Sequence, residues 1–304
     1  MAVSIQHVER VLAYLNENGE SETLKHFNIN SESLSRYTRR KKFWDTKQPK
    51  VLLLDCETTP IKAFAWGTYK QRIPHTSIIQ PSFLICWSAK WLFDSKIMCD
   101  VLTPEEAIRQ DDTRIVKSVW KLIDQCDVII AHNGKRFDIP YLKTRFVLDR
   151  LAPTSPYQVI DTYEVVRKNF LFPSNKLDYL GVLIRNKGKI KTDFDLWVRC
   201  LAGDQEALSY MVGYNKEDVA LLEEAYVFIR PFIHNHPNMA IYQEAHEPSC
   251  PTCGSTNIQE CGHYTTSVNR YLAFRCLDCG AICRSRATDV PVKCKSGILR
   301  PTAR

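Results

Sequence analysis

Hydrophobic and polar positions follow three successive patterns along the chain, and the first is helical. Apolar residues recur every three or four positions over residues 7–15, which predicts an amphipathic helix that an Asn-Gly pair ends. A shorter helix, a turn and a second helix follow, with Asn30 or Ser31 as the capping residue of the second helix. The pattern therefore predicts a small helical module over residues 1–48.

The second pattern, over residues 49–230, predicts one α/β domain. It opens with VLLL at 51–54, an uninterrupted apolar run that is typical of a strand buried on both faces. Runs rich in aromatic and branched residues predict three antiparallel strands, at 61–69, 82–92 and 96–103. The elements expected next are a helix over 113–125, a strand over 127–132, a helix over 137–148, a strand over 157–161 and a long final helix over 205–228. This order favours a ribonuclease-H-like mixed sheet flanked by helices.

The third pattern covers the end of the chain. Residues 231–249 contain three prolines and no clear periodicity, so we predict a linker there. Residues 250–304 combine clustered cysteines with a basic tail. No apolar run approaches the ~18 residues of a membrane span and no signal peptide opens the chain, so we expect a cytoplasmic protein without a membrane partner.

Charge and cysteine content add to this picture. The formal net charge is +7, with basic residues concentrated near both ends, and such an excess permits nucleic-acid binding. Five of the twelve cysteines are scattered singly through the first 200 residues, where small buried free thiols are expected. The other seven crowd into the last 55 residues, and this clustering indicates a metal site.

Two C-x2-C pairs separated by 22 residues form the core of this cysteine cluster. Two such pairs, joined by a β-hairpin, can bring four thiolates around one structural Zn²⁺ ion. The predicted ligands are Cys250, Cys253, Cys276 and Cys279, with Cys261, His263 and Cys283 as substitutes. The sequence therefore predicts a zinc ribbon. Its aromatic and basic residues would contact nucleic acid or protein, or else the aromatic residues would form the core of the ribbon while the charges keep it soluble.

Acidic residues stand at three places on the predicted elements of the α/β domain. Asp55 and Glu57 follow the buried strand, and the alternation of a strand would direct them to the same side. Asp138 opens a helix, while Tyr214 and Asp218 share one face of the final helix. Each has an ordinary explanation alone: a solvated turn, a helix cap or a common helical pair. Taken together, the three groups instead suggest one site.

These three clusters resemble the DEDD exonuclease superfamily, in the subclass whose last motif carries tyrosine. The segment HNGKRFDIPYL at 132–142 is similar to the proofreading exonuclease domain of family-B DNA polymerases. The segment NKLDYLGVL at 175–183 is similar to the helix that precedes the third motif of that family. The resemblance covers residues 49–230 and implies a 3'-5' exonuclease that uses two Mg²⁺ or Mn²⁺ ions.

The resemblance also implies a role for each motif residue. Hydrolysis of a phosphodiester needs an activated water and stabilisation of the leaving oxygen, which two divalent ions held by carboxylates can provide. Asp55 would bridge both ions, Glu57 and Asp218 would complete the site that carries the nucleophile, and Asp138 would hold the second ion through water. Tyr214 would orient the attacking water.

Candidates for substrate contact lie beside these motifs and in the helical module. Thr58 would contact the terminal nucleotide or serve as a turn hydroxyl, and Asn133 would bind substrate or tie its turn together. Phe137 is either a core residue or a stacking platform. The helical module resembles a helix-turn-helix, in which Arg36 and Arg39 would face DNA, or else it is a solvated basic helix.

We therefore expect a metal-dependent 3'-5' exonuclease that acts on nucleic acid, with DNA favoured over RNA. Two alternatives stay open: an exoribonuclease with the same site, and a DNA-binding or recruitment protein whose ribonuclease-H-like fold is an inactive scaffold. A proofreading role would need a separate partner, such as a polymerase or another replication or repair protein.

Overall fold

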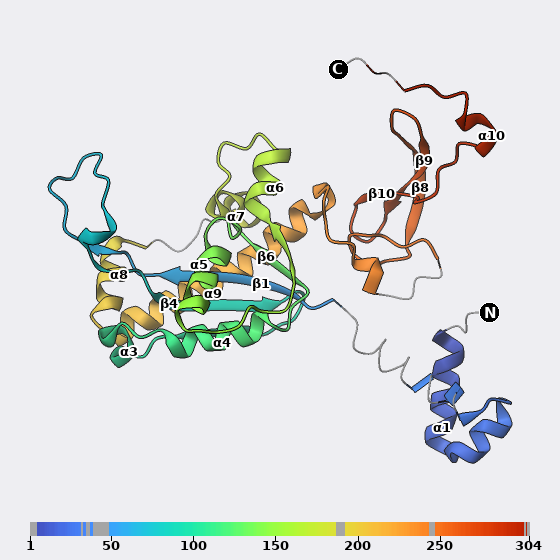
Figure 1. Ribbon diagram of the computed structural model, residues 1–304, viewed down its shortest axis with the longest axis horizontal. Coiled ribbons are helices and arrows are strands. Elements are labelled where there is room, and N and C mark those ends of the chain that lie inside the picture. Colours follow the sequence, from blue (N-terminus) through green and yellow to red (C-terminus); the bar gives the residue numbers. More distant parts are fainter. Residues whose placement is uncertain are drawn as a thin grey trace. The chain divides into compact units, whose positions relative to one another are not determined.

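The structure is a computed structural model, and its description covers residues 5–31, 33–34, 37–38, 49–186, 192–242, 247–300 and 302. The chain divides into two compact units. One comprises Lys50–Pro237, and the other comprises Met1–Pro49 together with Asn238–Arg304. Figure 1 shows the α/β unit and the helical and ribbon segments of the second unit.

A five-stranded mixed sheet forms the centre of the α/β unit, with the strand order β5-β4-β1-β6-β7. The strands are β1 (Val51–Thr58), β4 (Leu84–Trp91), β5 (Ile97–Val101), β6 (Val128–Ala131) and β7 (Gln158–Asp161). Strands β1, β4 and β5 pair antiparallel, whereas β1, β6 and β7 pair parallel. The antiparallel meander followed by parallel crossovers is the ribonuclease-H-like fold that the sequence predicts.

Helices cover this sheet and bury its central strand (Figure 1). The α-helices of the unit are α3 (Pro104–Arg109), α4 (Thr113–Ile123), α5 (Asp138–Leu148), α6 (Thr162–Asn169), α7 (Leu177–Arg185), α8 (Phe194–Leu201) and α9 (Gln205–Ile229). The unit also contains the 3-10 helices η1 (His75–Ser77), which lies outside the sheet, and η2 (Arg230–Phe232). Leu52 and Leu54 of β1 join a core with residues of α4 and α5, while α9 packs along β1 and β4. Leu53 is also fully buried, so β1 is covered on both faces as its apolar run predicts.

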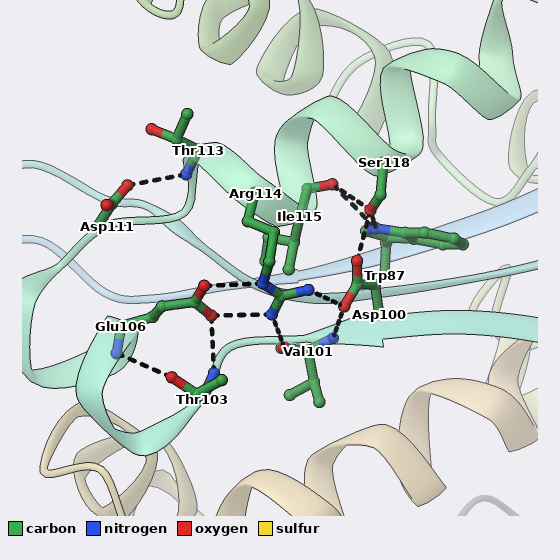
Figure 2. A network of polar contacts seen from close by, with 10 residues as sticks. All are labelled: Trp87, Asp100, Val101, Thr103, Glu106, Asp111, Thr113, Arg114, Ile115 and Ser118. Carbon is green, nitrogen blue, oxygen red and sulfur yellow. Dashed lines mark hydrogen bonds and ion pairs between the residues drawn. The ribbon is translucent and has the colours of Figure 1, made fainter.

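A polar network fixes the edge strand β5 to α3 and α4 (Figure 2). The guanidinium of Arg114 pairs with Glu106 at 2.7 Å and with Asp100 at 2.6 Å. Glu106 also completes a capping box with Thr103 at the start of α3. Asp100 in addition accepts a hydrogen bond from Ser118 Oγ at 2.6 Å, so its carboxylate has a structural role at the sheet edge.

The predicted strand over 61–69 is wrong. Only β2 (Lys62–Ala63) forms there, and it pairs with β3 (Ile78–Gln80) in a separate two-stranded sheet. Strand β4 occupies the edge of β1 along most of its length, so the segment finds no partner in the main sheet. We call residues 60–81 the arm; Thr59 closes its base, because its N–H donates to Phe83 O at 2.9 Å.

The helical segment of the second unit has its own small core. Helix α1 (Ile5–His26) contains a break at Gly19, whose φ of 77° and ψ of 171° separate two helices where the Asn-Gly pair predicts an end. Asn30 is the cap of the next helical turn, because its Oδ1 accepts a hydrogen bond from Ser33 N at 2.7 Å. The buried residues of this core are Val11, Leu34 and Tyr37.

The ribbon segment is a three-stranded antiparallel sheet with the order β10-β9-β8. Its elements are η3 (Met239–Tyr242), β8 (Ile258–Thr265), β9 (Arg270–Cys276), β10 (Ile282–Arg284) and α10 (Val292–Lys295). Three of its cysteines and Ala281 form the buried core, so thiols occupy the place that large apolar side chains fill in bigger domains. Across the described parts of the chain, no helix is long and apolar enough to cross a membrane.

Candidate metal centres

Three carboxylates meet at the end of β1. Asp55 and Glu57 come from the strand and Asp218 from the middle of α9, and one oxygen of each lies within 4.8 Å of the others. Asp218 is only 4% exposed. Like charges this close repel one another unless a cation or a proton intervenes. The set offers oxygen ligands only, which suits a hard divalent cation such as Mg²⁺ or Mn²⁺.

Helix α9 delivers its part of the site through its buried face. Met211, Asn215, Asp218 and Leu222 follow one another at intervals of three or four residues, and all four are buried. Helix α9 packs against β1 and β4, so this face meets the strand that carries Asp55 and Glu57. Two polar residues in an otherwise apolar stripe are thus the local signal of the site.

Asn215 is a site residue that the sequence reasoning missed. Its Nδ2 donates a hydrogen bond to Asp55 Oδ2 at 2.7 Å, and the side chain is fully buried. A neutral donor at this place holds one carboxylate oxygen of Asp55 in a fixed orientation. The signal that could have revealed Asn215 is its place on the apolar stripe of α9, one turn after Met211.

Tyr214 lies beside the carboxylates. Burial raises the pKa of its phenol well above the usual value of 10, and the neighbouring carboxylates of Asp218, Glu57 and Asp55 raise it further. A hydrogen bond with Asp218 acts in the same direction. The phenol of Tyr214 is therefore protonated at neutral pH and available for hydrogen bonding.

Asp138 lies outside the 4.8 Å set of the three carboxylates but contacts the strand that carries two of them. It begins α5, is 4% exposed, and its Oδ1 accepts a hydrogen bond from the backbone N–H of Cys56 at 3.1 Å. Cys56 stands between Asp55 and Glu57, so Asp138 faces the same stretch of β1. Burial raises the pKa of Asp138 to about 7. The turn before α5 passes close to the end of β6, and only glycine fits at position 134, because a Cβ there would lie 2.3 Å from Ala131 Cβ.

The substrate candidates of the α/β unit lie around this site. Thr58 is the last residue of β1. Asn133 has a left-handed φ of 64° and donates its backbone N–H to Asp161 Oδ1 at 2.9 Å, so the residue helps to tie its turn. Phe137 is 45% exposed and its ring stacks on Tyr141 at 5.8 Å, so it offers a surface for stacking rather than a core contact.

Two sets of basic residues differ in whether the structure describes them. Arg36 and Arg39, which the sequence places against DNA, lie outside the described residues. Arg145 on α5 is described, and it forms an ion pair with Asp112. Asp112 is fully buried and accepts a second hydrogen bond, from Leu84 N at 2.7 Å. The pair therefore joins α5 to the start of β4.

A second candidate centre lies in the ribbon, where four sulfur atoms are within 4.8 Å of one another. The Sγ atoms of Cys250 and Cys279 are 3.7 Å apart, and those of Cys253 and Cys276 are 3.6 Å apart. A tetrahedral Zn²⁺ with bonds of about 2.3 Å requires sulfur–sulfur edges of about 3.8 Å. A disulfide would instead need about 2.05 Å. The four thiols are thus spaced as a zinc site needs them.

The turns of the ribbon support the same ligand set. Gly254 and Gly280 follow the two C-x2-C pairs with left-handed φ values of 80° and 76°, which glycine adopts without strain. Of the three substitutes, Cys261 is exposed, and His263 Nε2 is 3.2 Å from the carboxylate of Asp289. Cys283 is close enough to Cys250 and Cys276 to interact with them electrostatically, but it lies outside the four-thiol set. The set that could hold zinc is therefore the four cysteines of the two pairs.

Comparison with known families agrees with this fold. A model of the RNase H superfamily matches residues 100–229, which run from β5 to the end of α9. The match contains Asp138, Tyr214 and Asp218, while Asp55 and Glu57 precede it on β1. No curated protein matches the chain. The chain therefore contains a ribonuclease-H-like domain, a fold of the nuclease type.

Proposed function

We propose that the chain is a metal-dependent 3'-5' exonuclease that hydrolyses phosphodiester bonds, with DNA as the favoured substrate. The observation that carries this proposal is the convergence of Asp55, Glu57 and Asp218 beside a protonated Tyr214 in a nuclease-type fold. The direction and the preference for DNA rest on the similarity of the motifs to family-B proofreading domains.

Metal ions would supply the central chemistry. Mg²⁺ and Mn²⁺ prefer carboxylate oxygens, and the three clustered acids offer such oxygens. Two such ions, when bound, activate a water and stabilise the leaving oxygen. Asp55, Glu57 and Asp218 would hold them, and Asp138 is the candidate for contact through water.

The residues around the ions would position the reactants. Asn215 fixes the orientation of the Asp55 carboxylate through its 2.7 Å hydrogen bond. The protonated hydroxyl of Tyr214, in its hydrogen bond with Asp218, can accept a hydrogen bond from the attacking water and orient it. The exposed ring of Phe137 would stack against a base near the end of the strand, and Thr58 would contact the terminal nucleotide.

The ribbon would serve binding rather than catalysis. Four thiolates would close the coordination sphere of a Zn²⁺ ion, which leaves no position for a water, so this ion would be structural. The guanidinium of Arg284 lies 4.0 Å from the ring centre of Tyr271 and 5.3 Å from that of Tyr264. Such a group of arginine and aromatic residues suits nucleic acid, and a polymerase or another replication or repair protein is the alternative partner.

A cleavage time course tests the proposed function. The protein is incubated with 5'-labelled single-stranded DNA or RNA in Mg²⁺, Mn²⁺ or EDTA, beside Asp55→Asn and the control Asp100→Asn. Asp100 is a suitable control because its carboxylate lies on the same sheet but pairs with Arg114 and is not part of the acidic cluster. We expect stepwise shortening of the strand from its 3' end, which requires metal and is faster for DNA than for RNA. Asp55→Asn should abolish this shortening, whereas Asp100→Asn should not. Internal cuts at the first time point, or no cleavage in any metal, would refute the proposal.

A further inference from the structure

The arm (residues 60–81) begins directly after the strand that carries the acidic cluster. Strand β1 ends at Thr58, and the chain returns to the sheet at β4. Within the arm, β2 pairs with β3, and Phe64 N donates to Ser77 O at 3.0 Å. Figure 1 shows this segment projecting away from the sheet, beyond the end of β1. Because Asp55 and Glu57 lie near that end, the arm extends from the edge of the candidate nuclease site.

Three aromatic side chains of the arm are exposed to an unusual degree. Phe64 and Tyr69 are each 76% exposed and Trp66 is 105% exposed. Aromatic residues carry large apolar surfaces and are normally buried, at least in part, by their own domain. Exposed aromatic residues gathered on one projecting segment indicate a surface that binds a partner.

The charge of the arm identifies the class of that partner. No acidic residue occurs between Glu57 and Asp94, whereas the arm carries Lys62, Lys70 and Arg72. A partner that is anionic and presents flat rings would match both features. Single-stranded nucleic acid has these two properties, because its bases are free to stack on aromatic side chains while its phosphates contact cations. An apolar protein surface would match the aromatic rings but would gain nothing from the cations.

A continuous set of contacts joins the base of the arm to Phe137. Ser82 Oγ donates to Thr59 O at 2.6 Å and lies 3.1 Å from the hydroxyl of Tyr141. The ring of Tyr141 stacks on the half-exposed ring of Phe137. Phe137 is thus one ring contact and two hydrogen bonds away from Thr59 at the base of the arm, so aromatic surface is available both at the site and beyond it.

We infer that the arm holds the single strand that leads into the nuclease site. Bases would stack on Phe64, Trp66 and Tyr69, and phosphates would contact the three cations of the arm. The inference rests on the proposed exonuclease function and specifies its substrate: a single-stranded end longer than the few nucleotides at the carboxylates.

Binding measurements test the inference on the full chain. Fluorescein-labelled oligothymidylates of 4 and 16 nucleotides are titrated in EDTA and followed by anisotropy. Trp66→Ala should weaken binding of the 16-mer by about 5- to 150-fold, the range for loss of one base–aromatic stack. The control Phe228→Ala removes a ring of α9 that is 51% exposed, and should leave the affinity unchanged. Equal affinities for Trp66→Ala and the unaltered protein would overturn the inference.

Salt dependence tests the cations separately from the rings. Lys70→Gln with Arg72→Gln should make the plot of log affinity against log salt less steep by about 1.4, since each phosphate contact with a single strand contributes about 0.7. The control Lys117→Gln with Lys121→Gln changes two exposed lysines of α4 and should leave the slope unchanged. If Trp66→Ala altered the sedimentation coefficient instead of DNA affinity, the arm would be a contact between copies and the inference would fail.

A small substrate separates failure of the arm from failure of the active site. The p-nitrophenyl ester of thymidine 5'-monophosphate would occupy the carboxylates without reaching the arm, so Trp66→Ala should cleave it in Mn²⁺ at the unaltered rate. Normal ester cleavage by Trp66→Ala together with an unaltered 16-mer affinity would refute strand binding by the arm but leave the nuclease function in place. If Trp66→Ala lost 16-mer binding while the unaltered protein cleaved neither the ester nor the strand, the result would support strand binding by the arm and refute the exonuclease function.

Discussion

The hydrogen bond from Asn215 to Asp55 leads to a quantitative prediction. Asn215 is fully buried, and its Nδ2 lies 2.7 Å from Asp55 Oδ2. Asn215→Ala removes the donor and leaves the carboxylate free to rotate. Hydrogen bonds to charged groups contribute about 1.5–3 kcal/mol, and loss of a residue that orients a metal ligand costs about 10- to 100-fold in metal affinity or activity. We therefore expect Mn²⁺ affinity to fall by about 10- to 100-fold.

Calorimetric titration with Mn²⁺ measures this effect directly, and steady-state hydrolysis at several Mn²⁺ concentrations gives a second readout. The control is Asn169→Ala, which removes a local hydrogen bond to Val165 O at the end of α6. Circular dichroism checks that both variants fold. A merely structural role for Asn215 would lower the thermal midpoint and leave the Mn²⁺ affinity of the folded protein unchanged, and that result would refute the reasoning.

Three further predictions concern other parts of the chain. Asp112→Ala leaves the nearly buried guanidinium of Arg145 without its partner, so the free energy of unfolding in urea should fall by about 3–5 kcal/mol, and a loss below about 1 kcal/mol would contradict the pairing. Tyr214→Phe should lower the hydrolysis rate at saturating Mn²⁺ on the order of 100-fold, because the hydroxyl orients the attacking water; an unchanged rate would exclude this role. Cys253→Ser should lower the zinc content below one ion per chain, which elemental analysis measures, and should make the ribbon sensitive to protease. A variant as resistant to protease as the unaltered protein would argue against a zinc-dependent fold.

The elements that the sequence predicts well are those with a single strong constraint. The run VLLL allows only a strand covered on both faces, and that strand is the centre of the sheet. The long apolar repeat of α9 fixes its buried face, and hence the meeting of Asp218 with the end of β1. The spacing of the four cysteines is equally restrictive, because two tight turns leave few arrangements for the thiols.

The features that the sequence does not predict depend on partners far apart in the chain. Residues 61–69 have the composition of a strand, but β4 already occupies the edge of β1, so propensity alone gives the wrong element. The place of Asn215 on the apolar stripe of α9 predicts burial, but its hydrogen bond to Asp55 follows only from the packing of α9 on β1. Likewise, the inward position of Asp138 follows from its bond to Cys56, which is 82 residues away in the sequence.

The proposed metal centre is tested most directly by measuring anomalous scattering from manganese in a crystal of the protein grown in saturating Mn²⁺. If these carboxylates hold the metal, manganese should give a peak at about 2.1 Å from carboxylate oxygens of Asp55, Glu57 and Asp218, the distance typical of small divalent cations of this type. The same crystal of Asp55→Asn should show a weaker peak or none. A map without manganese at these three carboxylates would contradict the central claim that they form the metal centre of a nuclease.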